Sequence, residues 1–236
     1  MNNPLRDYNN RRRYWALKEK RLTEHEKIVE RVFLKYLEGQ KERVLSAMPK
    51  KSFVEQIFNK EREAEIATTV MFPALKEVME QEGQEVAGRF DAPFTFTSEM
   101  DHWLKERAET FSKQINDTTY EQLSSELSAG VEAGEDYSQM ADRISDKYGE
   151  ISVGRAKTIA RTEAHGAQQK ANFEGYKQVG VPTKIWVAVM DTETRDTHAG
   201  TDGDEVPFDR PFDNGLMFPG DPNGPASETV ICRCTI

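Results

Sequence analysis

The chain has 236 residues, of which 37% are hydrophobic and 31% are charged, and its net charge at pH 7 is −9. No run approaches the roughly 18 consecutive apolar residues of a membrane helix. The basic N-terminus also lacks the apolar stretch of a secretory signal. We therefore expect no membrane association and a protein that is made and kept in a cytoplasm, with one large domain or two modest ones.

The charges are divided unevenly along the chain. Residues 1–62 carry a net charge of +7, with 16 Lys and Arg against 9 Asp and Glu, whereas residues 63–236 carry −16. A basic segment joined to an acidic body predicts two partners of opposite charge. The basic segment suits nucleic acid or an acidic protein ring, and the acidic body would be repelled by DNA.

Long helices are expected in the first part of the chain. Over residues 10–48, apolar residues recur at three- and four-residue steps, and the helix should end or bend at Pro49. A second helical run is expected over 51–88, with a kink or break at Pro73. A third begins near Ser98, whose hydroxyl can cap the helix.

Two further helices are expected before the pattern changes. A short one covers about 135–148, and the next covers about 152–179 and ends at Gly180. The second helix carries small residues that allow another backbone to approach closely, namely Ala156, Ala160, Ala164, Ala167 and Ala171.

The last part of the chain reads as short strands and turns. Residues Lys184–Met190 form a β-rich run, and Thr229–Cys232 is expected to be the last strand. The fold class is therefore α+β and predominantly α. We expect an elongated helical region over 1–150 and a small α+β module over 151–236.

An ordered series of short motifs occupies this module. It runs from Ala160-Arg-Thr-Glu163 through Trp186 and Asp191-Thr-Glu-Thr-Arg-Asp-Thr-His198 to a turn at Pro219-Gly-Asp221 and a terminal Cys232-Arg-Cys234. Each motif is weak alone, but the series in this order resembles the phage Mu F-like, or head morphogenesis, family of minor head proteins. The match covers about 75 residues.

The resemblance implies a non-enzymatic minor head protein in the capsid interior of a tailed bacteriophage, present in the host cytoplasm during assembly. Its implied partners are the portal protein, the scaffolding and major capsid proteins, and in some cases double-stranded DNA. Some relatives carry a toxin domain after the Cys-Arg-Cys motif. Because this sequence runs two residues past that motif, we expect no such domain here.

Two cysteines and one histidine are suited to bind a metal ion. Cys232 and Cys234 would place both sulfurs on one side of an extended strand, and His198 would add a nitrogen ligand. We consider zinc, with His165 or Asp191 as a fourth ligand. The alternative is that both cysteines are plain buried thiols and that His198 is a hydrogen-bonded loop residue.

A second set of side chains is charged and comprises Arg161, Glu163, Asp191, Arg195 and Arg233. We interpret it as an ion-pair network that holds the 152–179 helix against the C-terminal strands. The alternative is an enzyme or toxin site, with Glu163 or Asp191 as general base, Arg195 on an anionic substrate and His198 as proton shuttle.

The basic run near the N-terminus is a candidate DNA contact. Arg11, Arg12 and Arg13 could neutralise phosphates, and the interleaved Tyr14 and Trp15 could stack on bases. The alternative is a solvated helix start whose aromatic side chains pack on a neighbouring element.

Overall fold

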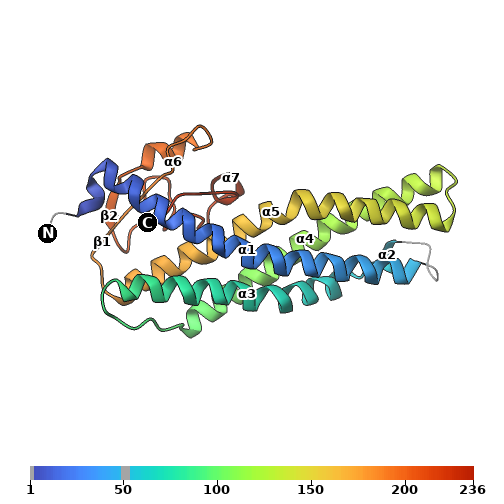
Figure 1. Cartoon of the computed structure of the whole chain (residues 1–236), viewed down its shortest axis with the longest axis horizontal. Helices are drawn as coiled ribbons and strands as arrows, with labels where there is room; N and C mark the ends of the chain where they lie inside the picture. The colour runs from blue at the N-terminus through green and yellow to red at the C-terminus, as the bar shows by residue number, and fades with distance from the viewer. Residues whose placement is uncertain (1–2, 49–53) are drawn as a thin grey trace. The chain divides into compact units, whose positions relative to one another are not determined.

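A computed structural model describes residues 3–48 and 54–236. Figure 1 shows a predominantly helical chain with a small two-stranded antiparallel sheet among the described residues, which confirms the expected fold class. In chain order the elements are a 3-10 helix Pro4–Arg6, α1 Tyr8–Ala47, α2 Val54–Ile57, α3 Lys60–Gly88, α4 Ser98–Glu132, α5 Tyr137–Gln178, β1 Thr183–Ile185, α6 Asp196–Thr201, β2 Glu205–Pro207 and α7 Ala226–Thr229.

Helices α1 and α4 agree with the expected runs, but the expected end of the first helix at Pro49 lies outside the described residues. Helix α3 continues through Pro73. A proline inside a helix costs about 3 kcal/mol. The fully buried side chains of Met71, Leu75 and Val78 on either side of it offset this cost.

The prediction of separate helices over 135–148 and 152–179 was wrong, because α5 is continuous from Tyr137 to Gln178. An isolated glycine inside a helix costs only about 1 kcal/mol relative to alanine. Ile144, Tyr148 and Ile151 are buried on one helical stripe across the supposed break, and their packing outweighs that cost. The expected boundary between residues 150 and 151 therefore lies inside α5, which ends at Gln178, two residues before Gly180 with its φ of +72°.

The predicted strand Thr229–Cys232 was also wrong. Thr229 ends α7, and Ile231 adopts a left-handed backbone conformation with φ +54°, which no strand tolerates. In the expected run 184–190, only residues up to Ile185 belong to β1, while Val187 forms an isolated bridge with Thr235. The apolar run signals burial here more than sheet pairing.

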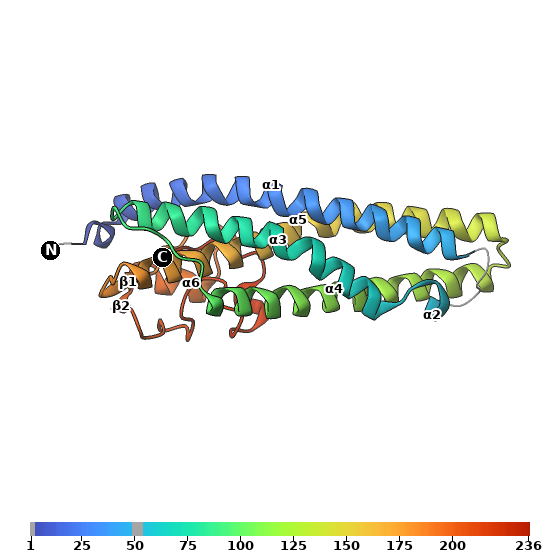
Figure 2. The ribbon, with the colours of Figure 1, turned by 90° about the horizontal axis from the view of Figure 1, so that it is seen from below.

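Residues Val29–Ala74 and Ser98–Lys157 form one compact unit, called unit 2. Its apolar cluster comprises Val44, Met48, Val54, Ile57, Phe58, Leu123, Ile144 and Tyr148. Helix α2 is a single turn packed beside α4 (Figure 2). In the same unit the hydroxyl of Tyr36 donates to Asn116 Oδ1 at 2.8 Å, and Arg43 pairs with Glu63, so these polar groups satisfy one another.

Residues Met1–Ile28, Leu75–Thr97 and Thr158–Ile236 form the other compact unit, called unit 1. The fully buried ammonium of Lys18 in α1 donates to Glu82 of α3 at 2.5 Å and to Asn172 of α5 at 2.8 Å. A small residue lets α5 approach α3 closely. A Cβ at Gly175 would lie 2.9 Å from Val86 Cγ1, and the alanines of the stripe are buried.

The segment after α5, called the C-terminal segment (179–236), folds against the start of α1 within unit 1. Figure 1 shows it in orange to red beside the blue helix. The indole N–H of Trp15 donates to the Arg233 carbonyl oxygen at 2.8 Å. The hydroxyl of Tyr14 donates to the Ile236 carbonyl oxygen at 2.9 Å. These bonds fix the end of the chain beside α1.

Candidate metal centre

The C-terminal segment brings His198 to Cys232 and Cys234. His198 lies on α6, and the two cysteines follow the left-handed turn at Ile231. The ring of Trp186 packs on the imidazole of His198 with centroids 5.2 Å apart. Trp186 is fully buried and belongs to the same apolar cluster as both cysteines, so its packing orients the histidine towards the sulfurs.

The three side chains have the geometry of a metal site. His198 Nδ1 lies 3.4 Å from Cys234 Sγ and 3.7 Å from Cys232 Sγ. Tetrahedral zinc with bonds of about 2.0–2.3 Å separates its sulfur and nitrogen ligands by about 3.6 Å. All three residues are buried, and their possible ligand atoms all lie within 4.8 Å of one another. The cluster could therefore hold a metal ion.

Glu228 completes the surroundings of the histidine. Its Oε2 lies 2.9 Å from His198 Nε2 and accepts a hydrogen bond from Thr197 Oγ1, also at 2.9 Å. A carboxylate close to one imidazole nitrogen favours the proton at that nitrogen and leaves the other nitrogen free to bind a metal. The sequence alone does not indicate Glu228, because only the fold of α7 brings it next to α6.

The two thiols differ in acidity. Burial opposes ionisation of Cys232, but a hydrogen bond from Cys234 and the neighbouring imidazoles of His165 and His198 together hold its pKa well below the usual value. The hydrogen bond to Cys232 and burial raise the pKa of Cys234 well above the usual value. The pair therefore favours one thiolate and one thiol that share a proton.

Neither expected fourth ligand belongs to this group. His165 Nε2 lies 2.7 Å from the Cys234 carbonyl oxygen, and its ring lies so close to Gly220 that a Cβ there would be 2.9 Å from Nδ1. Asp191 Oδ1 accepts from the Arg233 guanidinium at 2.7 Å. Both residues support the backbone and side chains around the cluster.

The predicted charged network divides into separate parts. Arg161 pairs with Glu19 at 2.7 Å and with Glu26 at 3.0 Å, and both carboxylates belong to α1. Within the C-terminal segment, Asp191 pairs with Arg233, and Arg195 donates to the Val230 carbonyl oxygen at 2.6 Å. Glu163 is buried on α5. Arg161 thus ties α5 to α1 and not to the C-terminal segment.

The basic run at the start of α1 is partly used inside the fold. The Arg11 guanidinium donates to Asp202 Oδ2 at 2.9 and 3.1 Å. Arg12 lies over the Trp15 ring, 5.4 Å from its centroid, whereas Arg13 is exposed. Because Tyr14 and Trp15 both hydrogen bond to the end of the chain, their rings serve packing.

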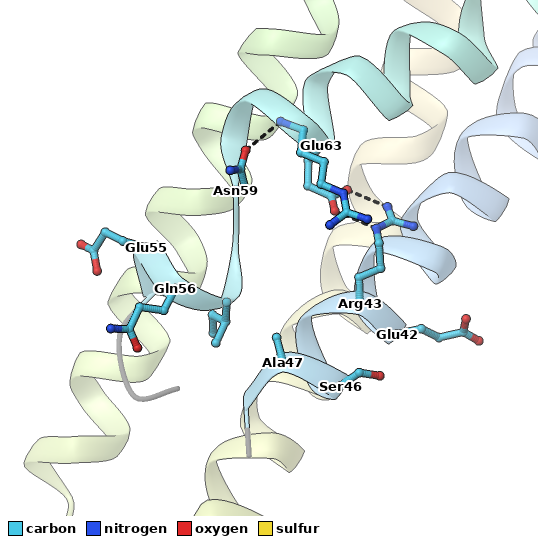
Figure 3. A pocket seen from close by; sticks show the side chains of 10 residues that line it. Glu42, Arg43, Ser46, Ala47, Glu55, Gln56, Asn59 and Glu63 are labelled. Atoms are coloured by element: carbon cyan, nitrogen blue, oxygen red, sulfur yellow. Dashed lines mark hydrogen bonds and ion pairs between the residues drawn. The ribbon is translucent and has the colours of Figure 1, made fainter. Parts of the chain in front are cut away.

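Unit 2 contains a pocket of about 770 Å³ between the end of α1, α2 and the start of α3 (Figure 3). Arg43 reaches across it and donates to both carboxylate oxygens of Glu63 at 2.7 and 2.6 Å. The charged pair of this pocket is satisfied internally, so the cysteine and histidine cluster is the stronger candidate site.

The fold and the site define a largely helical protein whose C-terminal segment is built around two cysteines and a histidine. The model of the family described as Phage Mu protein F like protein matches residues 121–236, so this part of the chain is similar to that family. The resemblance drawn from the motif series is thereby confirmed. No solved structure matches the chain.

Two relatives are similar to parts of the chain. The minor head protein GP7 of Bacillus phage SPP1 is 30% identical over 118 residues, which are 47% of this chain and 37% of that protein. The NAD(+)–arginine ADP-ribosyltransferase EFV of Enterococcus faecalis is 35% identical over 128 residues, which are 52% of this chain and 26% of that protein. The chain thus spans about a quarter to just over a third of these relatives' lengths.

None of the helices in the described part of the chain is both long and apolar enough to cross a membrane.

Proposed function

We propose that this chain acts as a minor head protein in the head morphogenesis of a tailed bacteriophage. The observation that carries the proposal is the family match over residues 121–236, the region that contains the cysteine and histidine cluster. The 30% identity with a phage minor head protein supports it. In this role the chain is a structural component of the head and not a catalyst.

The partners follow from the same role. The chain is made in the host cytoplasm and enters the capsid interior through contacts with the portal, scaffolding and major capsid proteins. The uneven charge, +7 over residues 1–62 and −16 over the remainder, supports two kinds of partner. Contact with double-stranded DNA would fall to the exposed Arg13 and Lys20, since Arg11 and Arg12 are engaged within unit 1.

Quantitative mass spectrometry of purified procapsids and mature virions tests this role. We expect a few copies of the chain per procapsid, and loss of the chain between procapsid and virion would indicate a scaffold-like or ejected role. Absence of the chain from both particles would overturn the proposal.

The proposal includes a structural zinc ion held by Cys232, Cys234 and His198. Zinc prefers thiolate and imidazole ligands in tetrahedral geometry, and the sulfur to nitrogen distances suit it. Bound metal would stabilise a segment with short regular elements. Cobalt(II) added to the metal-free chain should give the absorption of a cobalt–thiolate bond. The same spectrum from a variant with Cys232→Ser and Cys234→Ser would exclude these ligands.

The catalytic alternative centres on Glu163, Asp191 and His198. Asp191 is engaged by Arg233, and His198 lies between two sulfurs and the Glu228 carboxylate, which supports a structural use of both residues. Expression of the chain in bacteria separates the two roles. We expect normal growth, whereas growth inhibition that Glu163→Ala abolishes would favour an enzyme or toxin.

A further inference from the structure

Strand β1 has one edge paired with β2 and another that faces away from it. Trp186 N donates to the Asp204 carbonyl oxygen at 3.0 Å, and Lys184 occupies the ladder position two residues earlier. In an antiparallel ladder, alternate residues direct their N–H and C=O groups to opposite edges. Thr183 and Ile185 therefore direct theirs away from β2.

The same edge already accepts an extended segment at its downstream end. Val187 N donates to the Thr235 carbonyl oxygen at 2.8 Å, and Thr235 N donates back to Val187 at 2.9 Å. This bridge is antiparallel. An extended chain that continued along the same edge of β1 in the direction of Thr235 would therefore pass Ile185 and then Thr183; we call this path along the edge the track. Hydrogen-bonded positions recur every two residues. The next two positions on the track are therefore opposite Ile185 and Thr183.

A groove of about 710 Å³ follows this edge within unit 1. Its lining includes the five consecutive residues Val181 to Ile185, as expected when a groove runs along a strand. The rings of Tyr14, Phe90 and Tyr176 also line it. Phe90 is 49% exposed and meets Tyr176 edge-on, with centroids 6.3 Å apart. An apolar side chain of a bound segment would cover this exposed ring.

The tyrosine hydroxyls of the groove and the charged side chains at its rim are paired within unit 1. The Tyr176 hydroxyl donates to Tyr14 at 2.7 Å, and Tyr14 donates to the Ile236 carbonyl oxygen at 2.9 Å. At the rim, Arg89 pairs with a neighbouring carboxylate of α3 and Glu205 with Arg6. The groove consequently presents ring faces and strand backbone, which suit an uncharged ligand.

We propose that this groove binds an extended, uncharged segment of a partner protein, which adds as a third strand antiparallel to β1. Its backbone pairs with Ile185 and Thr183, and its alternate apolar side chains contact the Phe90 and Tyr176 rings. The inference rests on the geometry of unit 1 and is independent of the proposed role in head assembly.

A random heptapeptide library selected on the full chain supplies the probe. We expect enrichment of peptides with alternating apolar residues. Thr183→Pro removes one N–H from the free edge and should weaken their binding about tenfold. Thr183→Val is the matched control, because it also loses the hydroxyl bond to Glu205 Oε1 but keeps the N–H, and it should bind like the natural chain.

A second variant and a second measurement distinguish loss of peptide binding from misfolding of the Thr183→Pro variant. Phe90→Ala should also weaken the enriched peptides, because it removes ring contact without changing β1. Bound peptide should slow hydrogen exchange at the Thr183 and Ile185 amides.

The proposal is overturned if no peptide is enriched, or if the enriched peptides bind Thr183→Pro and Thr183→Val equally. Self-association of the natural chain that only Thr183→Pro abolishes would place a second copy in the groove and would also contradict it.

Discussion

Unit 2 and the C-terminal segment of unit 1 both bury polar side chains, but they satisfy them differently. In unit 2 the partners lie on long helices whose backbone bonds are local, and Tyr36, Gln40 and Asn116 bond directly to one another. The C-terminal segment has only short elements, and two sulfurs and an imidazole converge at its centre. Helical packing therefore stabilises unit 2, whereas the C-terminal segment depends on long-range links.

Removal of the metal should have the largest effect, and it should affect the C-terminal segment but not unit 2. A strong zinc chelator should increase amide hydrogen exchange across residues 183–236 by orders of magnitude, because bound metal contributes to folding. Exchange in the unit 2 helices should stay unchanged. Hydrogen exchange followed by mass spectrometry measures both regions in one sample, and equal responses of the two would refute the distinction.

A substitution in the polar contacts of unit 2 should, conversely, destabilise unit 2 and leave the C-terminal segment unchanged. Glu63→Gln breaks the partly buried ion pair with Arg43, and we expect a loss of about 2 kcal/mol in the free energy of unfolding. Glu61→Gln makes the same chemical change at an exposed position of α3 and should cost less than about 0.5 kcal/mol. Urea denaturation compares the two variants, and similar losses would show that the pair contributes little.

A smaller effect is expected from the carboxylate behind the metal ligand. Glu228→Gln should lower zinc affinity by about 10- to 100-fold, because His198 loses the partner that orients its ring. Glu193→Gln changes an exposed carboxylate of the same segment and should leave the affinity unchanged. Competition with a chromophoric chelator gives both affinities, and equal values would deny Glu228 this role.

The smallest expected effect concerns Lys184, which is buried among the rings of Phe173, Phe208 and Phe212. Burial lowers its pKa to about 8, against the opposing charges of Asp221 and Asp209. Between about pH 8 and its unfolded pKa of about 10.4, the unfolded chain holds one more proton at this position than the folded chain. The contribution of Lys184 to stability therefore rises with pH across this window.

Lys184→Met should remove that rise, and urea denaturation at pH values from 7.5 to 10 measures it. Lys177→Met, at an exposed position near the end of α5, should retain the rise. An identical pH dependence in both variants would show that Lys184 does not cause it.

The helices could be predicted because their apolar stripes recur along the chain, as in α1 and α4. Periodicity does not show whether the packing of a helix offsets the free-energy cost of a glycine or a proline inside it. For this reason the sequence predicted neither the continuity of α5 nor the passage of α3 through Pro73. The metal ligands could be proposed from their chemistry. The roles of Glu228 and Arg161 could not, because their partners become neighbours only in the folded chain.

The turn at Ile231 explains the remaining error. A β-branched residue rarely adopts positive φ, so the run from Thr229 to Cys232 resembled a strand. The surrounding fold imposes the turn, and the turn brings Cys232 to His198. The local signal and the tertiary structure therefore disagree next to the candidate site.

The metal content of the full chain, purified without chelator, tests the central claim most directly. Elemental mass spectrometry should find about one zinc ion per chain in the natural protein. The variant with Cys232→Ser and Cys234→Ser should contain almost none. Zinc absent from the natural chain, or present equally in both proteins, would contradict a metal centre at Cys232, Cys234 and His198.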